Sequence, residues 1–449
     1  MNKSRNEIVI LGAGESGTGA AILAKKKGFE VFVSDFGTIG PQYKSVLKHF
    51  DIDFEENGHT FERIEKALEV IKSPGIPDTA PPVKKAIEKG IKVISEIEFA
   101  SRYTDAKLIA ITGSNGKTTT TLLTYHILKK AGLNVGLAGN VGDSFARQVA
   151  EKEFDFYVLE ISSFQLDGMF DFKADIAILT NITPDHLDRY DYQFGNYINS
   201  KFRILQNMTK DDAFIFNADD PVTGEELKKR NIIPTQYSIT LSNAQQEQGV
   251  WIENEKMIFN INKNKFDMTL EQLALQGKHN TYNSMAASVA ARLVDVRKDS
   301  IKQSLSDFEN IPHRLEFVSN VHGITFINDS KATNINSTWY ALEYVDAPTV
   351  WIAGGQDKGN DYNELKSLVK QKVKAIVCLG TDNSKLHEAF EDDVEIMVDA
   401  GSAREAAIYA YNLAKKGEIV ILSPACASFD LFKNYQDRGD QFKKAVKEL

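Results

Sequence analysis

Residues Thr112–Thr119, with the sequence TGSNGKTT, have the types and spacing of a phosphate-binding loop. The apolar run Leu108–Ile111 before them predicts a strand, and a helix is predicted from Lys117 onward. Backbone N–H groups at the start of a helix point at a bound anion, and the helix dipole favours its charge. In such loops the lysine reaches the β- and γ-phosphates of a nucleotide, and the hydroxyl of the residue after it, here Thr118, binds Mg²⁺. The segment therefore predicts an ATP site.

The loop departs from the usual GxxxxGK[ST] pattern, because Ile111 stands where the first glycine is expected. The plainer interpretation is a glycine-rich turn followed by a surface lysine. The strand, the glycines, the lysine, the threonines and the helix occur together, and this combination favours phosphate binding.

Two further predicted strands end in side chains that could serve the same site. Tyr157–Leu159 runs into Glu160, and Ile176–Leu179 is followed by a polar cluster that contains His186. Open α/β sheets bind ligands at the carboxyl ends of their strands, and a carboxylate there could hold Mg²⁺. Taken singly, Glu160 could be an exposed strand end, His186 a surface side chain and Lys201 a solvated helix residue.

The chain begins with a second nucleotide-type pattern. GAGESG at Gly12–Gly17 follows the predicted strand Ile8–Leu11, and Asp35 ends the next strand. This is the fingerprint of an NAD-binding turn, with the aspartate on the ribose. A UDP-sugar would suit the same glycines, because they only permit close approach of a diphosphate to the backbone. Two such sites in one chain favour an ATP site plus a nucleotide-bearing substrate.

Three more strand ends carry ligand-suited loops in the last third of the chain. INDSKATN brings Asp329, Lys331 and Thr333, GGQDKG brings Lys358, and SPACASFD brings Ser428. Each loop alone is ordinary turn chemistry. Three of them at one sheet edge favour a binding site.

The elements that position these residues follow a β–α rhythm. Short Val- and Ile-rich runs, continuous as in strands buried on both faces, alternate with amphipathic helical stretches, which predicts an α/β fold with largely parallel sheets. We expect a Rossmann-like domain at 1–97, a central P-loop ATPase-like domain at 98–311 and a Rossmann-like domain at 312–449. The polar segment 231–267 is expected to form a small antiparallel insertion in the central domain.

Composition narrows the function classes. The net charge of −9 argues against sequence-independent nucleic-acid binding, which needs a basic face. Only two cysteines, Cys378 and Cys426, occur far apart, so no thiol-based zinc motif is predicted. Apolar runs fall short of the roughly 20 residues that span a bilayer. A cytoplasmic monomer without a membrane or nucleic-acid partner is expected.

The order of these motifs resembles the Mur ligase family over essentially the whole chain. TGSNGKTT, Gly139–Asn140, the Glu160 strand end, DHLDRY, GKHNTYN and HRLE are of the general family type. NDSKATN and SPACASFDLFKNYQDRG are similar to the member that adds D-glutamate. The resemblance implies that the carboxylate of UDP-N-acetylmuramoyl-L-alanine attacks the γ-phosphate of ATP. D-glutamate then displaces phosphate from the acyl phosphate, as a step of peptidoglycan precursor synthesis.

The resemblance also implies roles for individual residues. Catalysis is expected from Lys117, Glu160, His186, Lys201 and Lys331. Two Mg²⁺ ions are expected on Thr118, Glu160, His186 and a carbamylated Lys201. ATP is expected on Gly113, Ser114, Asn115, Gly116, Lys117, Thr118, Thr119, Asn283, Arg314 and Asp329. The UDP-sugar is expected on Gly14, Glu15, Ser16, Asp35, Gly75, Asn140 and His186, and D-glutamate on Thr333, Lys358, Ser428 and Tyr435.

The chain departs from the family pattern at two places. Phe36 and Gly37 stand where some members have an arginine for the uridine phosphate, and Tyr435 stands where phenylalanine is common. Three alternative functions stay open at this point: a sister ligase for another amino acid, an NAD-dependent dehydrogenase, and a non-catalytic nucleotide-binding protein.

Overall fold

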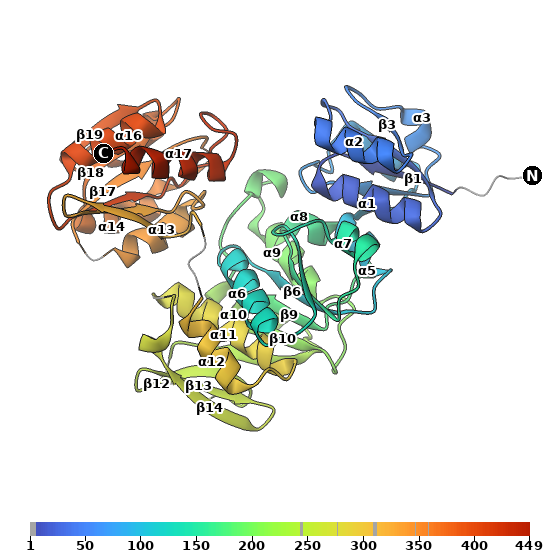
Figure 1. Cartoon of the computed structure of the whole chain (residues 1–449), viewed down its shortest axis with the longest axis horizontal. Coiled ribbons are helices and arrows are strands. Elements are labelled where there is room, and N and C mark those ends of the chain that lie inside the picture. Colours follow the sequence, from blue (N-terminus) through green and yellow to red (C-terminus); the bar gives the residue numbers. More distant parts are fainter. Residues whose placement is uncertain (1–5, 243–245, 276, 309–311, 346, 358) are drawn as a thin grey trace, which may run out of the picture. The chain divides into compact units, whose positions relative to one another are not determined.

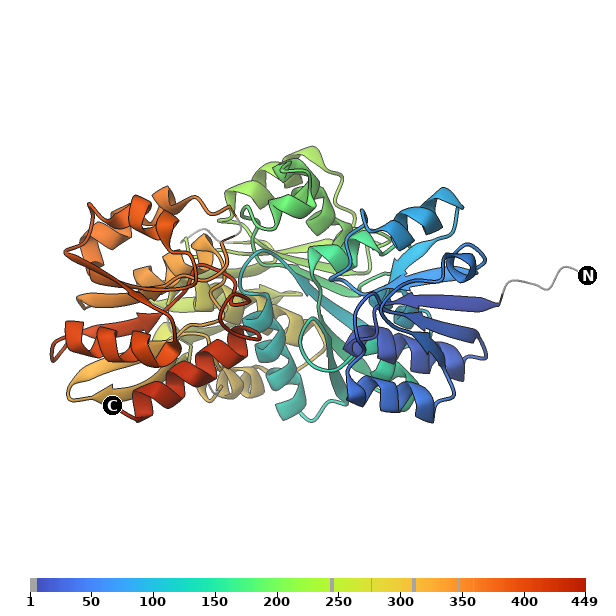
Figure 2. The same cartoon turned by 90° about the horizontal axis from the view of Figure 1, so that it is seen from above.

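The computed structural model describes residues 6–242, 246–275, 277–308, 312–345, 347–357 and 359–449. The chain divides into two compact units, Met1–Phe308 and Glu309–Leu449. The first unit holds two β-sheets and the second holds one (Figures 1 and 2). The predicted α/β class is confirmed, because most strand pairs in the three sheets are parallel and helices alternate with the strands. The predicted limits of the three domains stay a prediction.

The N-terminal sheet has five parallel strands in the order β3-β2-β1-β4-β5. Its strands are β1 (Glu7–Leu11), β2 (Glu30–Ser34), β3 (Asp53–Glu55), β4 (Glu69–Lys72) and β5 (Val93–Ser95). Its helices are α1 (Glu15–Lys26), α2 (Pro41–His49), α3 (Phe61–Ile64) and α4 (Pro81–Glu88). Figure 1 shows α1 and α2 side by side on one face of this sheet.

The central sheet has nine strands in the order β14-β13-β12-β11-β10-β9-β6-β8-β7. They are β6 (Lys107–Thr112), β7 (Val135–Gly139), β8 (Phe156–Glu160), β9 (Ile176–Leu179), β10 (Ala213–Asn217), β11 (Thr235–Ile239), β12 (Gly249–Glu253), β13 (Lys256–Ile261) and β14 (Asn264–Thr269). The helices are α5 (Glu96–Ser101), α6 (Lys117–Lys130), α7 (Phe145–Glu151), α8 (Ser163–Asp167), α9 (Phe194–Phe202), α10 (Pro221–Lys229), α11 (Lys278–Leu293) and α12 (Lys298–Ser306). Short 3₁₀ turns occupy Leu187–Arg189, Arg203–Leu205 and Leu270–Gln272.

The antiparallel segment is part of this same sheet. Only the pairs β12–β13 and β13–β14 are antiparallel, whereas β11 pairs in parallel with both β10 and β12. The antiparallel strands predicted at 231–267 therefore extend the central sheet at its far end and form no layer of their own.

The C-terminal sheet has the order β15-β16-β20-β17-β18-β19. Its strands are β15 (Glu316–Val321), β16 (Ile324–Asn328), β17 (Thr349–Ala353), β18 (Val373–Leu379), β19 (Ile396–Ala400) and β20 (Ile419–Leu422), and only β15 is antiparallel to its neighbour. The helices are α13 (Ile335–Tyr344), α14 (Lys366–Lys372), α15 (Ser384–Phe390), α16 (Ala403–Leu413) and α17 (Tyr435–Lys447), with a 3₁₀ turn at Tyr362–Leu365.

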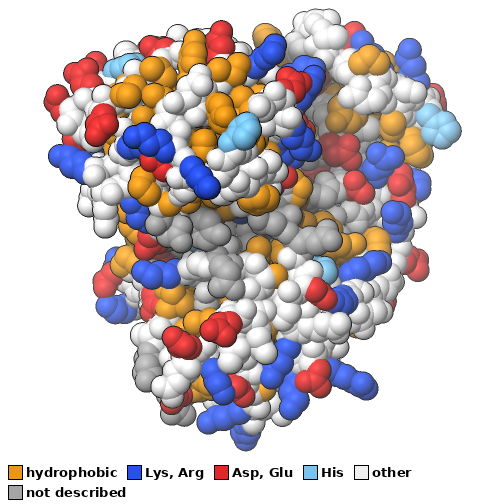
Figure 3. Space-filling model, turned by 60° about the vertical axis from the view of Figure 1, so that its left-hand side comes forward, with side chains coloured by type: hydrophobic (Ala, Val, Ile, Leu, Met, Phe, Trp, Pro, Cys, Tyr) orange, Lys and Arg blue, Asp and Glu red, His pale blue; other side chains and the backbone are white. Residues whose placement is uncertain are grey.

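Alternation along each buried strand explains why these runs are apolar throughout. In β17, Val350 and Ile352 face the core shared with α16 and α17, while Trp351 and Ala353 face the core under α13 and α14. Successive side chains of a strand point to opposite faces, so a strand covered on both faces needs apolar residues at every position. The surface differs: Figure 3 shows acidic and basic side chains interspersed across the face that it draws.

The glycine turn after β1 generates a stability prediction. A Cβ on Gly17 of α1 would lie 1.8 Å from the carbonyl oxygen of Gly12, so Gly17→Ala must push the helix off the turn. We expect this variant to lower the free energy of unfolding by about 1–3 kcal/mol, the usual cost of overpacking, in urea titrations of the full chain.

Gly224→Ala in α10 is the matched control. A Cβ there has nothing within 4 Å, so the replacement should instead stabilise the chain by about 0.5–1 kcal/mol through helix propensity. Equal and favourable shifts for both variants would contradict the close approach at Gly17.

Candidate functional site

Four neighbouring parallel strands of the central sheet bring the predicted phosphate and metal residues to one edge. The order β9-β6-β8-β7 places their carboxyl ends side by side, and Glu160 of β8 pairs with Ile111 of β6 and Gly139 of β7. Asn140, Glu160, the loop 113–116 and the segment after β9 therefore lie next to one another. This is the edge at which open α/β sheets bind their ligands.

The phosphate loop is held by backbone geometry that only glycine tolerates. Gly113 and Gly116 have φ of 146° and 80°, and a Cβ on them would lie 1.9 Å from Thr180 Oγ1 and 2.5 Å from Asn283 Oδ1. Ile111, by contrast, is a buried residue of β6. The missing first glycine is thus explained by a shorter loop that starts two residues later.

The segment after β9 fixes the loop from the other side. Ser114 N donates to the Asn181 carbonyl (2.9 Å), and Asn115 N donates to Asn181 Oδ1 (3.0 Å). Ser114 Oγ donates to the Thr183 carbonyl at 2.8 Å and lies 3.0 Å from the hydroxyl of Tyr197. The Ser114 side chain therefore anchors the loop. Any contact of Ser114 with a phosphate would come from the loop backbone, because its hydroxyl is already bonded within the protein.

Lys117 and Asn283 make hydrogen bonds with this loop and with the helix that follows it. Lys117 Nζ donates to the carbonyls of Gly113 and Ser114, both at 2.8 Å. Asn283 of α11 accepts a hydrogen bond from Thr120 Oγ1 at 3.1 Å, so α11 reaches the loop. The hydroxyl of Thr119 is buried and has no hydrogen-bond partner within the described part of the chain.

Glu160 has the character of a cation ligand. Its side chain is only 2% exposed, and Oε1 accepts a hydrogen bond from Asn140 Nδ2 at 2.8 Å. Oε2 is buried and finds no partner among the residues that the structure describes. Leaving a buried carboxylate oxygen unpaired is costly, and a Mg²⁺ ion held with phosphate oxygens fits that position.

Lys201 of α9 is buried beside the loop at 2% exposure. Nζ donates to Thr112 Oγ1 at 3.2 Å and lies 5.2 Å from the centroid of the Tyr197 ring. Burial, reinforced by the nearby charge of Lys117, holds the pKa of Lys201 well below its usual range, although carboxylates including Glu160 act against this shift. The site therefore favours the neutral amine of Lys201 over its ammonium form more strongly than water does.

His186 takes an unusual backbone conformation at the same edge. It has φ of 52° and precedes the 3₁₀ turn Leu187–Arg189. Its ring packs edge-on against Phe164 at 5.1 Å, and Nε2 lies 3.7 Å from Asp185 Oδ2. Arg189 Nη2 donates to the Ile76 carbonyl at 3.4 Å, which ties this segment to the loop after β4.

Five of the predicted UDP-sugar residues lie at the carboxyl edge of the N-terminal sheet, whereas Asn140 and His186 lie at the edge of the central sheet. Asp35 accepts hydrogen bonds from Ala13 N at 2.7 Å and Gly37 N at 2.8 Å, so its carboxylate orders the glycine turn. Gly14 caps α1, and Glu15 and Ser16 form its first turn. Phe36 is 78% exposed beside this turn, and Gly75 is exposed in the loop after β4.

Arg314 and Asp329 lie together in the second unit. Asp329 follows β16, is buried, and accepts hydrogen bonds from Ser423 Oγ (2.8 Å) and Leu315 N (3.2 Å). Burial raises the pKa of Asp329 to about 6, and the charge of Arg314 opposes that rise. Arg314 Nε is buried without a hydrogen-bond partner in the described residues.

Of the residues predicted for D-glutamate, Thr333 lies on the loop after β16, Ser428 on the loop after β20, and Tyr435 at the start of α17. Lys331 Nζ lies 5.4 Å from the ring centroid of Tyr435, the first residue of α17. Thr333 is half-buried after β16, and Ser428 is buried after β20. Lys358 lies outside the described residues. These loops adjoin in space because β16, β20 and β17 are consecutive in the sheet.

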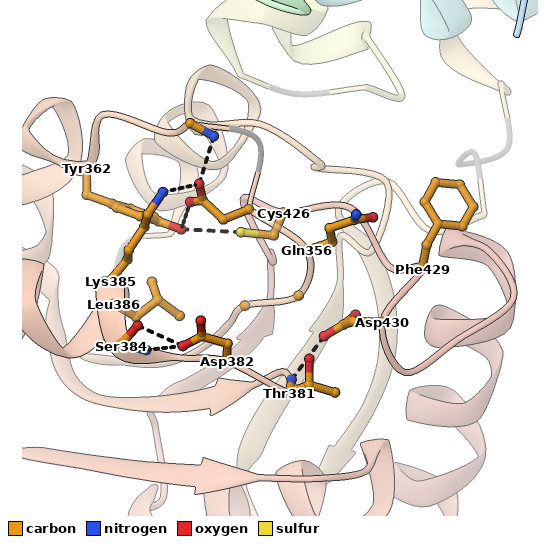
Figure 4. Close-up of a pocket in the computed structure, with 14 residues that line it drawn as sticks. Gln356, Tyr362, Thr381, Asp382, Ser384, Lys385, Leu386, Cys426, Phe429 and Asp430 are labelled. Carbon is orange, nitrogen blue, oxygen red and sulfur yellow. Dashed lines mark hydrogen bonds and ion pairs between the residues drawn. The ribbon is translucent and has the colours of Figure 1, made fainter. Parts of the chain in front are cut away.

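A cavity of about 610 Å³ opens at the carboxyl ends of β17, β18 and β20. On one side Lys385 pairs with Asp357 at 2.7 Å, and the Tyr362 hydroxyl lies 3.3 Å from Cys426 Sγ (Figure 4). On another side Asp430 accepts a hydrogen bond from Thr381 N at 3.1 Å (Figure 4).

Arg438 is a residue that sequence reasoning missed. It is 1% exposed, and its guanidinium donates to the side chain and carbonyl of Ser330 and to the carbonyls of Gly354, Cys426 and Ala427. One side chain thus ties together the loops after β16, β17 and β20. Its position in the amphipathic helix α17 is typical of a solvated side chain, so nothing in the sequence indicated these links, although Arg438 lies within the segment SPACASFDLFKNYQDRG.

Known protein domains and relatives match the chain along its length. The MurD N-terminal domain matches residues 7–80, the Mur ligase middle domain 111–291, and the glutamate ligase domain of Mur ligases 313–426. A UDP-N-acetylmuramoylalanine–D-glutamate ligase of Bacteroides fragilis is 57% identical over 98% of this chain and 99% of its own. A relative of the same name from Christiangramia forsetii is 55% identical over 99% of both chains.

Solved structures of low identity show the same fold. A pseudomurein peptide ligase type C from Methanothermus fervidus has a TM-score of 0.62 at 21% identity, covering 94% of this chain and 97% of that one. The MurF ligase of Thermotoga maritima, solved with ADP, has a TM-score of 0.61 at 14% identity, covering the whole of both chains.

The buried amine of Lys201 generates a pH prediction. Between its lowered folded pKa and about 10.5, the unfolded chain binds one proton more than the folded chain, so stability rises with pH. Lys201→Met removes this titration. The variant should therefore be more stable than the parent near pH 7.5, and its advantage should shrink by up to about 1.4 kcal/mol per pH unit toward pH 9.5.

Urea unfolding at several pH values in CO₂-depleted buffer measures the difference. Lys210→Met, at an exposed position, is the control and should show no such trend. A stability difference between Lys201→Met and the parent that stays constant with pH would show that Lys201 remains an ammonium in the folded chain.

Proposed function

We infer the reaction from one premise: this chain belongs to the Mur ligase family. It is an ATP-using ligase of peptidoglycan precursor synthesis. We propose that it joins D-glutamate to UDP-N-acetylmuramoyl-L-alanine. The observation that carries the chemistry is the sheet edge at which the phosphate loop, Glu160 and Lys201 meet. The full-length matches to D-glutamate ligases carry the choice of amino acid, and they do not favour the dehydrogenase alternative.

The proposed reaction has two steps. A carboxylate oxygen of the substrate's L-alanine attacks the γ-phosphorus of ATP, the bond to the bridging oxygen breaks, and ADP leaves. The amine of D-glutamate then attacks the acyl carbon, the amide bond forms, phosphate leaves, and the amine proton passes to solvent. Both steps bring anions together, so positioning and charge neutralisation are what the protein must supply.

The phosphate loop supports the first step. Its glycines have positive φ and lead the chain into the N-terminus of α6, where first-turn backbone N–H groups and the helix dipole stabilise a nucleotide phosphate. Lys117 would leave the loop carbonyls for the γ-phosphate, and Asn283, Arg314 and Asp329 would hold the rest of ATP. Thr118, Glu160 and His186 would hold Mg²⁺, which neutralises phosphate charge when bound. The unpaired oxygen of Glu160 supports this assignment.

Lys201 is proposed to be carbamylated. A neutral amine can add to CO₂ and lose a proton to solvent, which turns a buried cation into a carboxylate-like metal ligand. The lowered pKa of Lys201 supports this chemistry, because an ammonium has no lone pair for the addition. The neighbouring charge of Lys117 would stabilise the anion that forms.

The other two substrates are assigned to the remaining strand-end loops. Gly14, Glu15, Ser16, Asp35, Gly75, Asn140 and His186 are proposed to bind the UDP-sugar. Phe36 replaces the arginine of some family members, and its exposed ring offers the nucleotide an apolar face in place of a charge. Thr333, Lys358, Ser428 and Tyr435 are proposed to bind D-glutamate, with Lys331 near the reacting carboxylate.

The cellular setting is also a proposal. The described residues contain no helix with the length and apolar character needed to cross a membrane. We propose a cytoplasmic monomer organised as three domains at 1–97, 98–311 and 312–449, acting on small molecules and without a nucleic-acid partner.

Phosphate release should depend on D-glutamate. With ATP and UDP-N-acetylmuramoyl-L-alanine, D-glutamate should support turnover, whereas L-glutamate, L-lysine and meso-diaminopimelate should not. Mass spectrometry of the product should show the added glutamyl group. Lys117→Ala should lower turnover by about 1,000-fold, as expected for loss of a group that stabilises transition-state charge. Turnover with one of the other amino acids would assign the chain to a sister ligase.

Lys201→Ala should be nearly inactive and partly rescued by acetate. The truncated side chain leaves space beside Thr112 in which a small carboxylate can replace the carbamate. Lys201→Met is the control, because its side chain fills the same space and should prevent rescue. A fully active Lys201→Ala enzyme would exclude a functional carbamate.

A further inference from the structure

Three potential metal ligands of different types converge in the second unit. Cys378 of β18, His387 of α15 and Asp399 of β19 bring Sγ, a ring nitrogen and a carboxylate oxygen within 4.8 Å of one another. His387 Nε2 is already 3.1 Å from Asp399 Oδ1. None of these residues belongs to the ATP, UDP-sugar or D-glutamate loops assigned above.

The fold dictates this convergence. Cys378 and Asp399 are direct partners in the parallel ladder between β18 and β19, so their side chains share one face of the sheet. Cys378 is buried under α15 together with Leu386 and Phe390. The helix that packs there carries His387 one residue after Leu386, at the rim of the same core.

The donor set selects a class of cation. Thiolate and imidazole suit zinc and similar first-row ions, whereas Mg²⁺ and Ca²⁺ prefer oxygen ligands. On a tetrahedral zinc ion, bonded S, N and O atoms lie about 3.3–3.6 Å apart. Atoms within 4.8 Å need only small side-chain rotations to reach that spacing. We propose that Cys378, His387 and Asp399 form a binding site for a zinc-class divalent cation, with water as the fourth ligand.

The surroundings suit such a site. Asn383 Nδ2 donates to Asp399 Oδ1 at 2.8 Å and to the Cys378 carbonyl at 3.2 Å, so it orients one ligand against another. Groups of this kind hold metal ligands in place in known sites. The side chains of His387 and Asp399 are 34% and 61% exposed, which gives the ion a route from solvent.

Binding has a balanced chemistry and a structural consequence. The Cys378 thiol gives its proton to solvent and bonds the ion as a thiolate, and no oxidant or reductant is needed. The turn that connects β18 to α15 also supplies Thr381 and Asp382 to the wall of the 610 Å³ cavity. An ion bound by Cys378 and His387 would link the two ends of this turn and restrict its movement. The inference concerns a separate site and does not rest on the proposed ligase function.

Cobalt titration of the full-length chain, without a polyhistidine tag and stripped of metal, tests the site. One equivalent of Co²⁺ should produce a thiolate-to-cobalt charge-transfer band in the near ultraviolet. One equivalent of Zn²⁺ should abolish the band, and millimolar Mg²⁺ should not. A cobalt ion at the ATP site cannot mimic this signal, because no cysteine is among the ligands proposed there.

Variants identify the ligands. Cys378→Ser should lose the band, and His387→Ala, at a partly exposed position, should weaken Co²⁺ binding at least about tenfold. Cys426→Ser is the matched control, because Cys426 is the only other cysteine and is also buried; it should keep the band. No band at one equivalent, a band that survives Cys378→Ser, or unchanged affinity in His387→Ala would overturn the proposal.

Discussion

The contact between the phosphate loop and the segment after β9 is the constraint on which the first unit depends. Gly113 lies so close to Thr180 that no side chain fits between them, and Asn181 bonds the backbone on either side of Ser114. In the loop that is fixed in this way, Lys117 bonds to the carbonyls of Gly113 and Ser114. Lys201 bonds to the hydroxyl of Thr112 at the start of the loop. A backbone that binds an anion must be held before the anion arrives, since ordering it later would cost binding energy.

Buried charge is the cost of this arrangement. Lys201 and Glu160 are both almost inaccessible, and each would be more stable in water. The two cases differ: burial shifts the lysine toward its neutral form, whereas one oxygen of the glutamate has no hydrogen-bond partner among the described residues. Buried titratable groups with shifted pKa values or missing hydrogen-bond partners are characteristic of ligand-binding sites. Burial of the apolar side chains of β6, β8 and β9 stabilises the fold and offsets the free-energy cost of burying these two groups.

The regular elements were predictable from local sequence because β1, β9 and β20 are continuous apolar runs between turns. The polar first turns of helix α11, which begins at Lys278, pack toward the phosphate loop through Asn283. The strand-end positions of Glu160 and Asp329 could also be predicted. The burial of Lys201 and the links made by Arg438 could not, because they depend on contacts between distant segments. Cys378, His387 and Asp399 likewise have no motif spacing, because the ladder register joins Cys378 to Asp399 and the packing of α15 adds His387.

The position of Arg438 has a kinetic consequence. Its guanidinium bonds to groups 108, 84 and 12 residues away along the chain, and the two longest of these contacts form slowly because loop closure precedes them. The loops after β16, β17 and β20 become joined only when α17 docks and this cation sheds its water. A ligand that binds only the joined loops therefore adds its binding free energy to the docking of α17.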